Sequence, residues 1–401
     1  MKRVYFLTCL IFILLHILFP LAIYSIFGFR YEYYPVGEQY VYFGAGILLL
    51  SLAVASFCIF LYSKRKRSIT IQDLRSSKYL QGMAVEFLFL LSIMINIFSI
   101  VATGSFEAIL KGAANSTLFS YLKLFLDLRL LYFCVLIKSY SDKKVAMILV
   151  WSGLYFLITM LYHSRSGILW IVLFNLWIIS GIKISSKIKK RIIYFIFALA
   201  LAAPFLFLVA TNARTNTKYS ASYIAHKLIA RISFDEIAGI ELEQYLEGSY
   251  KKIIFEEKYS LKNQGEQILN SLLPGDLFPS DVQPNQYWRA IFAGWREDLA
   301  KEHYMSMTFM LPMYFILKYG FSLGFIYFIV FFFCMYILIS RIKDPVASIF
   351  LIGTLTYSIF QYFDWCYHFQ DVFYFTLTFF AIRTCAFIFR KVGIKKIRLR
   401  F

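Results

Sequence analysis

Long apolar runs alternate with short polar connections along most of the chain. The hydrocarbon core of a bilayer is about 30 Å thick, and a helix of roughly 20 apolar residues crosses it. Strands of a membrane barrel would instead give alternating segments of about ten residues. The pattern therefore predicts an all-α polytopic membrane protein. About ten transmembrane helices are expected, at residues 4–28, 40–62, 80–103, 118–137, 145–162, 167–182, 192–211, 321–340, 345–363 and 371–389.

One long polar stretch, residues 212–320, interrupts the alternation and divides the chain. Before it we expect an N-terminal bundle of about seven helices at 1–211, and after it about three helices with a basic tail at 321–401. Apolar residues recur at helical spacing within 222–245, which predicts an amphipathic helix. The stretch contains no cysteine that could stabilise an independent domain through a disulfide. We therefore expect a long helical cap packed on the outer end of the bundle.

The net charge of +19 gives this bundle an orientation. Basic residues collect in alternate short loops, as they do on the cytoplasmic side of membrane proteins. Because the charge is spread between apolar runs, nucleic acid is not the expected partner. Both termini are predicted to be cytoplasmic, with 163–166 and 212–320 on the opposite, periplasmic side. The basic segments are KRKR (64–67), KSYSDKK (138–144), KISSKIKKR (183–191), RIK (341–343) and RKVGIKKIRLR (390–400).

Composition excludes several other classes of protein. The chain is 60% hydrophobic and only 16% charged, whereas soluble domains average about a quarter charged residues. Its six cysteines show no paired spacing typical of a disulfide framework or a metal site. It has no Walker loop, GxGxxG, HExxH or DxD motif. Any transferase here is therefore expected to use a donor that is not a nucleotide, and to need no cofactor and no protein-bound metal.

The segment YHSRSG, residues 162–167, is a polar island between two apolar runs. Its Arg165, and Arg214 after the predicted span 192–211, each lie within about one turn of a predicted outer end, where topology does not favour arginine. The planar guanidinium matches phosphate oxygens, so several arginines around one outer cleft would bind a lipid-linked diphosphate. Snorkelling to headgroups is the simpler explanation for an isolated arginine. For Arg165 a functional role is favoured, because SRSG is expected to form a tight turn.

Other outer residues are weaker candidates. Four of the five histidines fall in outer loops, among them His163 and His303, and histidine exchanges protons near neutral pH. Histidine also tolerates membrane interfaces, so chance accounts equally well for this distribution. A surface ladder with Lys227 and Asp235 is an equally good explanation of Arg231.

Charged residues also lie inside the predicted spans, where they face the bundle or a cavity and are functional candidates by default. Lys123 and Asp127 are one helical turn apart, and Arg129 follows them. Pairing of Lys123 with Asp127 is an equally adequate structural account. Glu86 and Arg383 are further charges inside predicted spans.

Taken together, the pattern resembles the O-antigen polymerases, which polymerise oligosaccharide repeat units in bacterial surface polysaccharide synthesis, and their relatives the O-antigen ligases. As topology the resemblance covers most of the chain, and as motif about 30 residues. The residues that carry it are SRSG at 164–167, Arg214, the long loop, and SMTFMLPMYFILKYGFSLG at 306–324 with Gly320 and Gly324.

The resemblance implies a site for undecaprenyl-diphosphate-linked oligosaccharides, as both donor and acceptor, on the periplasmic face of the inner membrane. Arg165 and Arg214 would hold the diphosphate, with Arg231 or Arg289 on the distal phosphate or the sugars. The base for the acceptor hydroxyl would be His303, His163 or a loop carboxylate, of which Glu236 is the main candidate and Asp298 another. Tyr287, Trp288 and Tyr319 would bind sugars, although interfacial anchoring is the commoner role of such aromatics. A chain-length regulator protein is a further possible partner.

Three alternatives stay open. An O-antigen ligase would differ only in its acceptor, which is lipid A–core. A lipid-linked-glycan flippase or other transporter predicts repeated halves and charges along a central path, whereas the sequence shows no halves and its polar residues concentrate on one side. A structural or receptor protein would have no need for clustered outer arginines.

Overall fold

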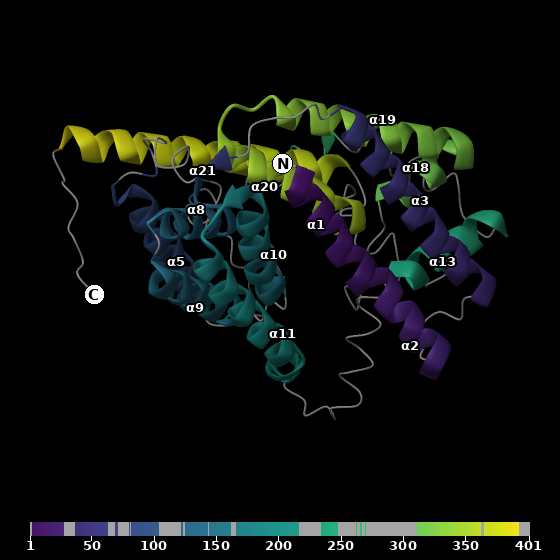
Figure 1. Cartoon of the computed structure of the whole chain (residues 1–401), viewed down its shortest axis with the longest axis horizontal. Coiled ribbons are helices and arrows are strands. Elements are labelled where there is room, and N and C mark those ends of the chain that lie inside the picture. Colours follow the sequence, from purple (N-terminus) through teal and green to yellow (C-terminus); the bar gives the residue numbers. More distant parts are fainter. Residues whose placement is uncertain are drawn as a thin grey trace. The chain divides into compact units, whose positions relative to one another are not determined.

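The computed structural model describes the residues that form the helices and two short strands of the chain (Figure 1). They are 2–27, 37–62, 69–70, 80, 82–103, 122, 125–142, 144–161, 166–215, 234–247, 262, 265–266, 269, 311–361 and 365–392.

These residues form an all-α membrane protein, apart from one pair of two-residue strands. Helices dominate because lipid offers no partner for backbone N–H and C=O groups, which a helix satisfies within its own segment. Four described helices are long and apolar enough to cross a membrane, namely Arg3–Ile26, Glu38–Leu61, Phe321–Ser340 and Val372–Lys391. Shorter apolar helices occupy Ala84–Ser99, Val145–Thr159, Gly167–Gly181 and Pro345–Tyr357. These eight coincide with eight of the ten predicted spans, and the count of ten stays a prediction.

The chain divides into two compact units. Unit 1 comprises Met1–Lys66, Ser220–Ile342 and Leu351–Gln370, and unit 2 comprises Arg67–Tyr219, Lys343–Phe350 and Asp371–Phe401. Helices α20 (Pro345–Gln361) and α21 (Trp365–Lys391) contribute residues to both units. The predicted division of the chain at 211 and 320 stays a prediction.

Unit 1 is built around an aromatic core between the first helix and α19. The Tyr5 ring lies 6.0 Å from Phe332 and 6.4 Å from Tyr336, and its hydroxyl is 3.1 Å from Ser56 Oγ of α3. Its described elements are α1 (Lys2–Ile13), the π-helical turn η1 (Leu14–Leu18), α2 (Phe19–Phe27), α3 (Glu38–Tyr62), α13 (Phe234–Leu246), α18 (Leu311–Tyr319) and α19 (Phe321–Ser340).

Unit 2 has a second aromatic core, where the ring of Phe350 lies 5.3 Å from Phe133 and 5.7 Å from Phe174. The two strands pair in parallel, with Ile69 opposite Ile182. Its described elements, besides parts of α20 and α21, are β1 (Ile69–Thr70), α5 (Ala84–Thr103), α8 (Leu128–Ser141), α9 (Val145–Leu161), α10 (Ser166–Gly181), β2 (Ile182–Lys183) and α11 (Ser186–Thr215).

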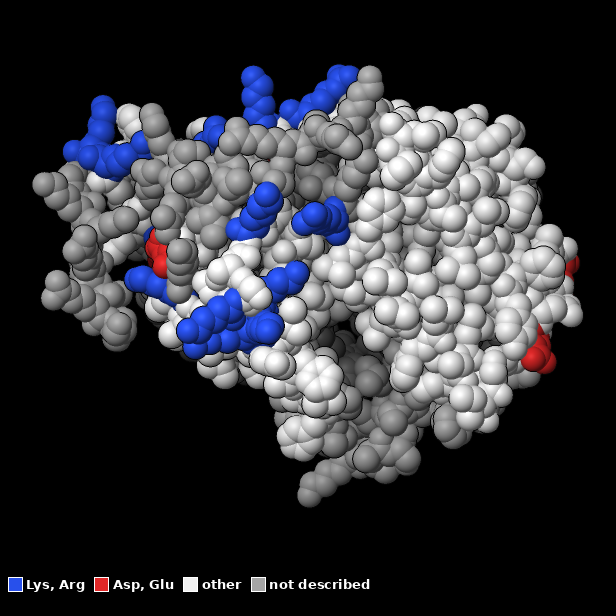
Figure 2. All heavy atoms as spheres, in the orientation of Figure 1, with Lys and Arg blue, Asp and Glu red and all other residues white. Residues whose placement is uncertain are grey.

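Large apolar side chains cover much of the outside of the spans. Phe57 and Phe60 on α3, and Phe380 on α21, are each more than 60% exposed. In Figure 2, lysine and arginine side chains gather over one part of the face shown, while a broad area carries almost no charge. Such surfaces suit contact with lipid hydrocarbon rather than water.

Three helix boundaries differ from those predicted. Residues 126 and 127 are not helical and α8 starts at Leu128, so 118–137 is not one continuous helix. Helix α11 runs over 30 residues and reaches Thr215, beyond the apolar part of its sequence. Helix α21 begins at Trp365, so residues 365–370 are helical where a loop was expected. In the last two cases hydropathy marks the apolar part of a helix, whereas the hydrogen bonding continues past it.

Two glycines shape the corner between α18 and α19. Gly320 has φ 83° and ψ 164°, a conformation that is almost restricted to glycine. One turn later, a Cβ on Gly324 would lie 2.2 Å from the Phe315 carbonyl oxygen. Gly324 therefore allows α19 to pack directly on the backbone of α18, as small residues do in membrane helix pairs.

We predict that Gly324→Ala destabilises unit 1, because the added methyl group forces α18 and α19 apart. Overpacking of this kind costs about 1–3 kcal/mol. Thermal unfolding of the purified protein in detergent measures the effect. The matched control is Gly46→Ala in α3, where nothing lies within 4 Å of an added Cβ; it is expected to leave the Tm equal or slightly higher. Equal Tm values for the two variants would contradict this account of the corner.

Candidate functional site

Most of the predicted site residues lie outside the described part of the chain. Three lie within it: Arg214 is the second-last residue of α11, Glu236 is in the first turn of α13, and Tyr319 is the last residue of α18. The residues outside it are Arg165, His163, His303, Arg231, Arg289, Tyr287 and Trp288. For the described three, α11 belongs to unit 2, and α13 and α18 belong to unit 1.

Helices α9 and α10 touch closely at the ends that residues 162–165 connect. A Cβ on Gly167, in the first turn of α10, would lie 2.2 Å from Thr159 Oγ1 of α9. The Thr159 hydroxyl donates to the Phe156 carbonyl oxygen at 2.9 Å, which fixes its position. Of the segment SRSG, Ser166 and Gly167 are the first residues of α10, and the rest of the expected turn lies outside the described residues. The glycine serves the close approach of two helices.

Tyr319 stands in a cluster of aromatic rings at the end of α18. Its ring lies 4.8 Å from Tyr327 and 6.3 Å from Phe315, and the Lys318 ammonium group is 5.6 Å from its centre. Burial, and then the neighbouring Tyr327, raise the pKa of the Tyr319 phenol, so it stays protonated at neutral pH. The side chain is 41% exposed, which leaves a surface suited to stacking on a sugar or to anchoring at the interface.

Helix α13 is seated on the first turns of α3, where the two helices cross (Figure 1). A Cβ on Gly239 would lie 2.9 Å from the backbone of Tyr40, so the contact requires glycine. The Gly37 N–H donates to Glu243 Oε1 at 2.9 Å, and the Tyr40 hydroxyl donates to Glu247 at 3.3 Å. A carboxylate at the start of α3 also complements the helix dipole. Within the long polar stretch, α13 thus packs on the apolar helix α3. That the whole stretch forms a cap stays a prediction.

Two of the charged groups predicted inside spans are explained by the ends of helices. Glu86, in the first turn of α5, pairs with Lys138, in the last turn of α8, which also donates to the Gly82 carbonyl oxygen. The Arg383 guanidinium lies 4.0 Å from the carboxylate of Asp344, the residue directly before α20, and the Arg383 side chain is 58% exposed. The arginine therefore extends towards the start of α20. Both charges therefore have an oppositely charged partner, although Oε2 of Glu86 is buried without a hydrogen-bond partner among the described residues.

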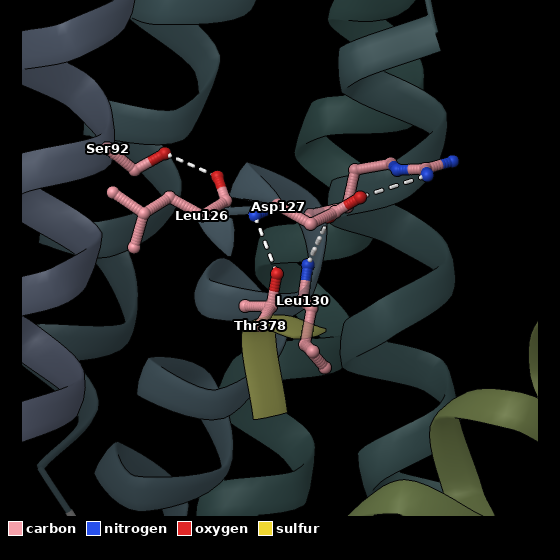
Figure 3. Close-up of polar contacts among 6 residues, drawn as sticks. Ser92, Leu126, Asp127, Leu130 and Thr378 are labelled. Atoms are coloured by element: carbon pink, nitrogen blue, oxygen red, sulfur yellow. Dashed lines mark hydrogen bonds and ion pairs between the residues drawn. The ribbon is translucent and has the colours of Figure 1, made fainter. Parts of the chain in front are cut away.

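Asp127 caps the start of α8 and belongs to a network that joins three helices (Figure 3). Its carboxylate accepts from the Leu130 N–H at 2.9 Å, and its own N–H donates to Thr378 Oγ1 of α21 at 2.9 Å. The Ser92 hydroxyl of α5 donates to the Leu126 carbonyl oxygen at 3.0 Å. The backbone groups next to the break in the helix are therefore satisfied by side chains, as an apolar surrounding requires.

Among the described residues, Arg129 forms an ion pair with Asp127, at 3.1 Å between Nη2 and Oδ2. Lys123, the partner that the sequence suggested, lies outside the described residues. The Arg129 guanidinium also lies 5.8 Å from the centre of the Trp170 ring in α10. Neither Asp127 nor Arg129 is among the site residues that the sequence predicts. The signal that identifies the network is an aspartate directly before the run LRLLYF, which is typical of a helix N-cap.

An apolar groove of about 480 Å³ runs along α3 in unit 1. None of the three described candidates, Arg214, Glu236 and Tyr319, is among its described lining residues. Its lining residues are Gln39, Tyr42, Phe43, Gly46, Ile47, Leu50 and Phe321.

No family model, curated protein or solved structure matches the chain. The chemistry of the site therefore has to be judged from its residues. Within the described part, unit 2 offers a guanidinium held by a carboxylate next to an indole. Such a group binds anions, and phosphate oxygens fit it best.

We predict that Gly239→Ala loosens α13 from α3, because the new methyl group meets the backbone of Tyr40. Amide hydrogen exchange in 234–246 is expected to rise several-fold, while exchange in 128–141 stays unchanged. Gly153→Ala in α9 is the matched control, since nothing lies within 4 Å of an added Cβ there. Unchanged protection of 234–246 in Gly239→Ala would show that the close contact of Gly239 with α3 does not hold α13 in place.

We further predict that Thr378→Val destabilises unit 2, because the Asp127 N–H loses its acceptor. The expected cost is about 1 kcal/mol, since hydrogen bonds in membrane proteins average less than those in soluble cores. Thr378→Ser keeps the acceptor and retains the Tm. Thr376→Val is the matched control, because among the described residues that exposed hydroxyl bonds within its own helix, to Val372 at 2.8 Å. If Thr376→Val lowers the Tm as much as Thr378→Val, the hydrogen bond between Asp127 and Thr378 makes no particular contribution to the stability of unit 2.

Proposed function

We propose that the protein polymerises lipid-linked oligosaccharide repeat units at the periplasmic face of a bacterial inner membrane, in the synthesis of O-antigen or a related surface polysaccharide. Both termini lie in the cytoplasm in this proposal, and the long loop 212–320 lies in the periplasm. Donor and acceptor are both carried on undecaprenyl diphosphate.

The observation that carries the proposal is the tight junction of α9 and α10. Gly167 against Thr159 holds the two helix ends together, and only residues 162–165 connect them. Arg165 directly precedes the first residue of α10, Ser166. A helix N-terminus presents unpaired N–H groups and a partial positive charge. An arginine next to such a terminus supports the binding of a diphosphate there.

The reaction transfers a glycan without redox chemistry. The bond between C1 of the donor sugar and its phosphate oxygen breaks, and the electron pair leaves with undecaprenyl diphosphate. The acceptor hydroxyl oxygen bonds to C1, and its proton passes to a base. Because negative charge grows on the leaving diphosphate, fixed cations beside it lower the barrier.

The residues take the roles that the resemblance implies. Arg165 and Arg214 hold the diphosphate, and the penultimate position of Arg214 in α11 agrees with such a place near the outer end of that span. Glu236 is the candidate base that lies in a described helix, α13, which is seated on α3.

We predict that Arg165→Ala abolishes long glycan chains, with a loss of about 10²–10³-fold in rate, as for other single contacts to a developing charge. The measurement is incubation of the purified protein in lipid nanodiscs with lipid-linked repeat units, followed by gel analysis of the glycan ladder. Arg341→Ala, after the last turn of α19 at the predicted cytoplasmic side, is the matched control and should give a normal ladder.

Other outcomes of the same assay separate the alternatives. A normal ladder from Arg165→Ala would remove that residue from the site. Transfer of a repeat to lipid A–core in place of a ladder would favour a ligase. A protein that binds the repeats without covalent change would contradict the polymerase proposal and favour transport.

A further inference from the structure

We propose that Arg129 is a further phosphate-binding residue, placed just inside the outer surface of unit 2 and positioned by Asp127. This proposal rests on the proposed function, because it takes the ligand to be the diphosphate of a polyprenyl lipid. The observation behind it is an ion pair built at a break in an apolar segment, with the cation next to the first turns of α10.

The break at residues 126 and 127 is held by buried side chains of unit 2. Ser92 and Thr378, which are 1% and 0% exposed, each supply a hydroxyl to the backbone next to it. Two buried side chains from different helices therefore hold the start of α8 in place. Non-helical backbone at membrane depth is tolerated where protein surrounds it or where it lines a cavity.

The helix cap alone does not account for the ion pair. Asn or Ser at the N-cap would accept the Leu130 N–H as well as Asp127 does. A charged pair in an apolar segment is costly, and such charges are commonly retained for function. The cap explains the aspartate's first oxygen, whereas the second oxygen is used to hold Arg129.

The orientation of the pair favours Arg129 as the group that faces a ligand. Its side chain is 28% exposed, against 13% for that of Asp127. The carboxylate lies on one side of the guanidinium and the Trp170 ring lies 5.8 Å from it. A planar cation fixed in this way is preorganised for phosphate oxygens, with less loss of side-chain freedom on binding.

The depth of the pair agrees with an outer site. Helix α8 has 14 residues, so Asp127 lies about 21 Å from its predicted cytoplasmic end, at 1.5 Å per residue. Trp170 is four residues, or about 6 Å, from the predicted outer end of α10. The two distances add up to nearly the thickness of the hydrocarbon core. Arg129 thus lies in the outer half of the predicted span, about one turn inside the predicted outer end of α10, and Arg165 precedes the same helix.

Binding of undecaprenyl diphosphate to the full-length protein in nanodiscs tests this proposal without requiring turnover. We expect Arg129→Gln to weaken binding about tenfold or more, as for other hydrogen bonds to charged groups. Arg129→Lys keeps the charge and the fold, yet its ammonium group lacks the planar fork, so it should weaken diphosphate binding several-fold. Undecaprenyl monophosphate should be affected less than the diphosphate in both variants.

Two further variants separate positioning from folding. Asp127→Asn keeps the cap but removes the charge that orients Arg129, so diphosphate affinity should fall several-fold while the Tm changes little. Arg383→Gln is the matched control, since that exposed arginine pairs at a helix end, and its affinity should equal that of the unaltered protein.

Unchanged diphosphate affinity in Arg129→Gln or Arg129→Lys would overturn the proposal. So would equal weakening for the monophosphate and diphosphate together with a lower Tm, because this indicates a structural role. If Arg129→Gln loses binding and the unaltered protein builds no ladder, the anion site stands and the polymerase proposal fails. If the unaltered protein builds a ladder and Arg129→Gln binds the diphosphate normally, the polymerase proposal stands and the anion site at Arg129 fails.

Discussion

The requirement that every backbone polar group find a partner without water governs this structure. Inside an apolar segment an open N–H or C=O has no solvent to bond with, so helices are favoured almost everywhere. Where a helix is broken, other side chains have to supply the missing partners. The start of α8 illustrates this, because Asp127, Ser92 and Thr378 replace the bonds that a continuous helix would have made.

The second constraint is that helices in a membrane have to approach each other closely. Helices in a membrane gain no hydrophobic energy from meeting each other, so they depend on close van der Waals contact. Gly167, Gly239 and Gly324 each stand where a Cβ would lie within 3 Å of a neighbouring helix. All three lie near positions where the polar parts of the chain meet the spans, so close packing helps to hold the regions in which the candidate site residues occur.

Hydropathy was sufficient to predict the all-α class and the place of eight apolar helices, four of them long enough to cross a membrane, since the cost of exposing polar groups to lipid is large and is repeated along each helix. It failed at residues 118–137, where the average is apolar but Asp127 is a cap. A cap depends on one carboxylate and on Thr378 more than 250 positions away, and neither contributes to a window average. The roles of Arg165 and Arg214 rest on resemblance and stay predictions, because side-chain contacts at an outer surface leave no periodic signal.

The seat of α13 on α3 has a consequence for how the protein is made. Its hydrogen bond from Gly37 to Glu243 joins residues 206 positions apart. A chain that emerges at about 5–20 residues per second leaves the start of α3 uncovered for roughly 10–40 s before α13 is synthesised. During that interval the surface that Gly239 later fits is open to chaperones or to the wrong helix. Unit 1 is thus completed late in synthesis, and a chain truncated before Glu243 would keep its first spans while lacking the hydrogen bond that joins α13 to the start of α3.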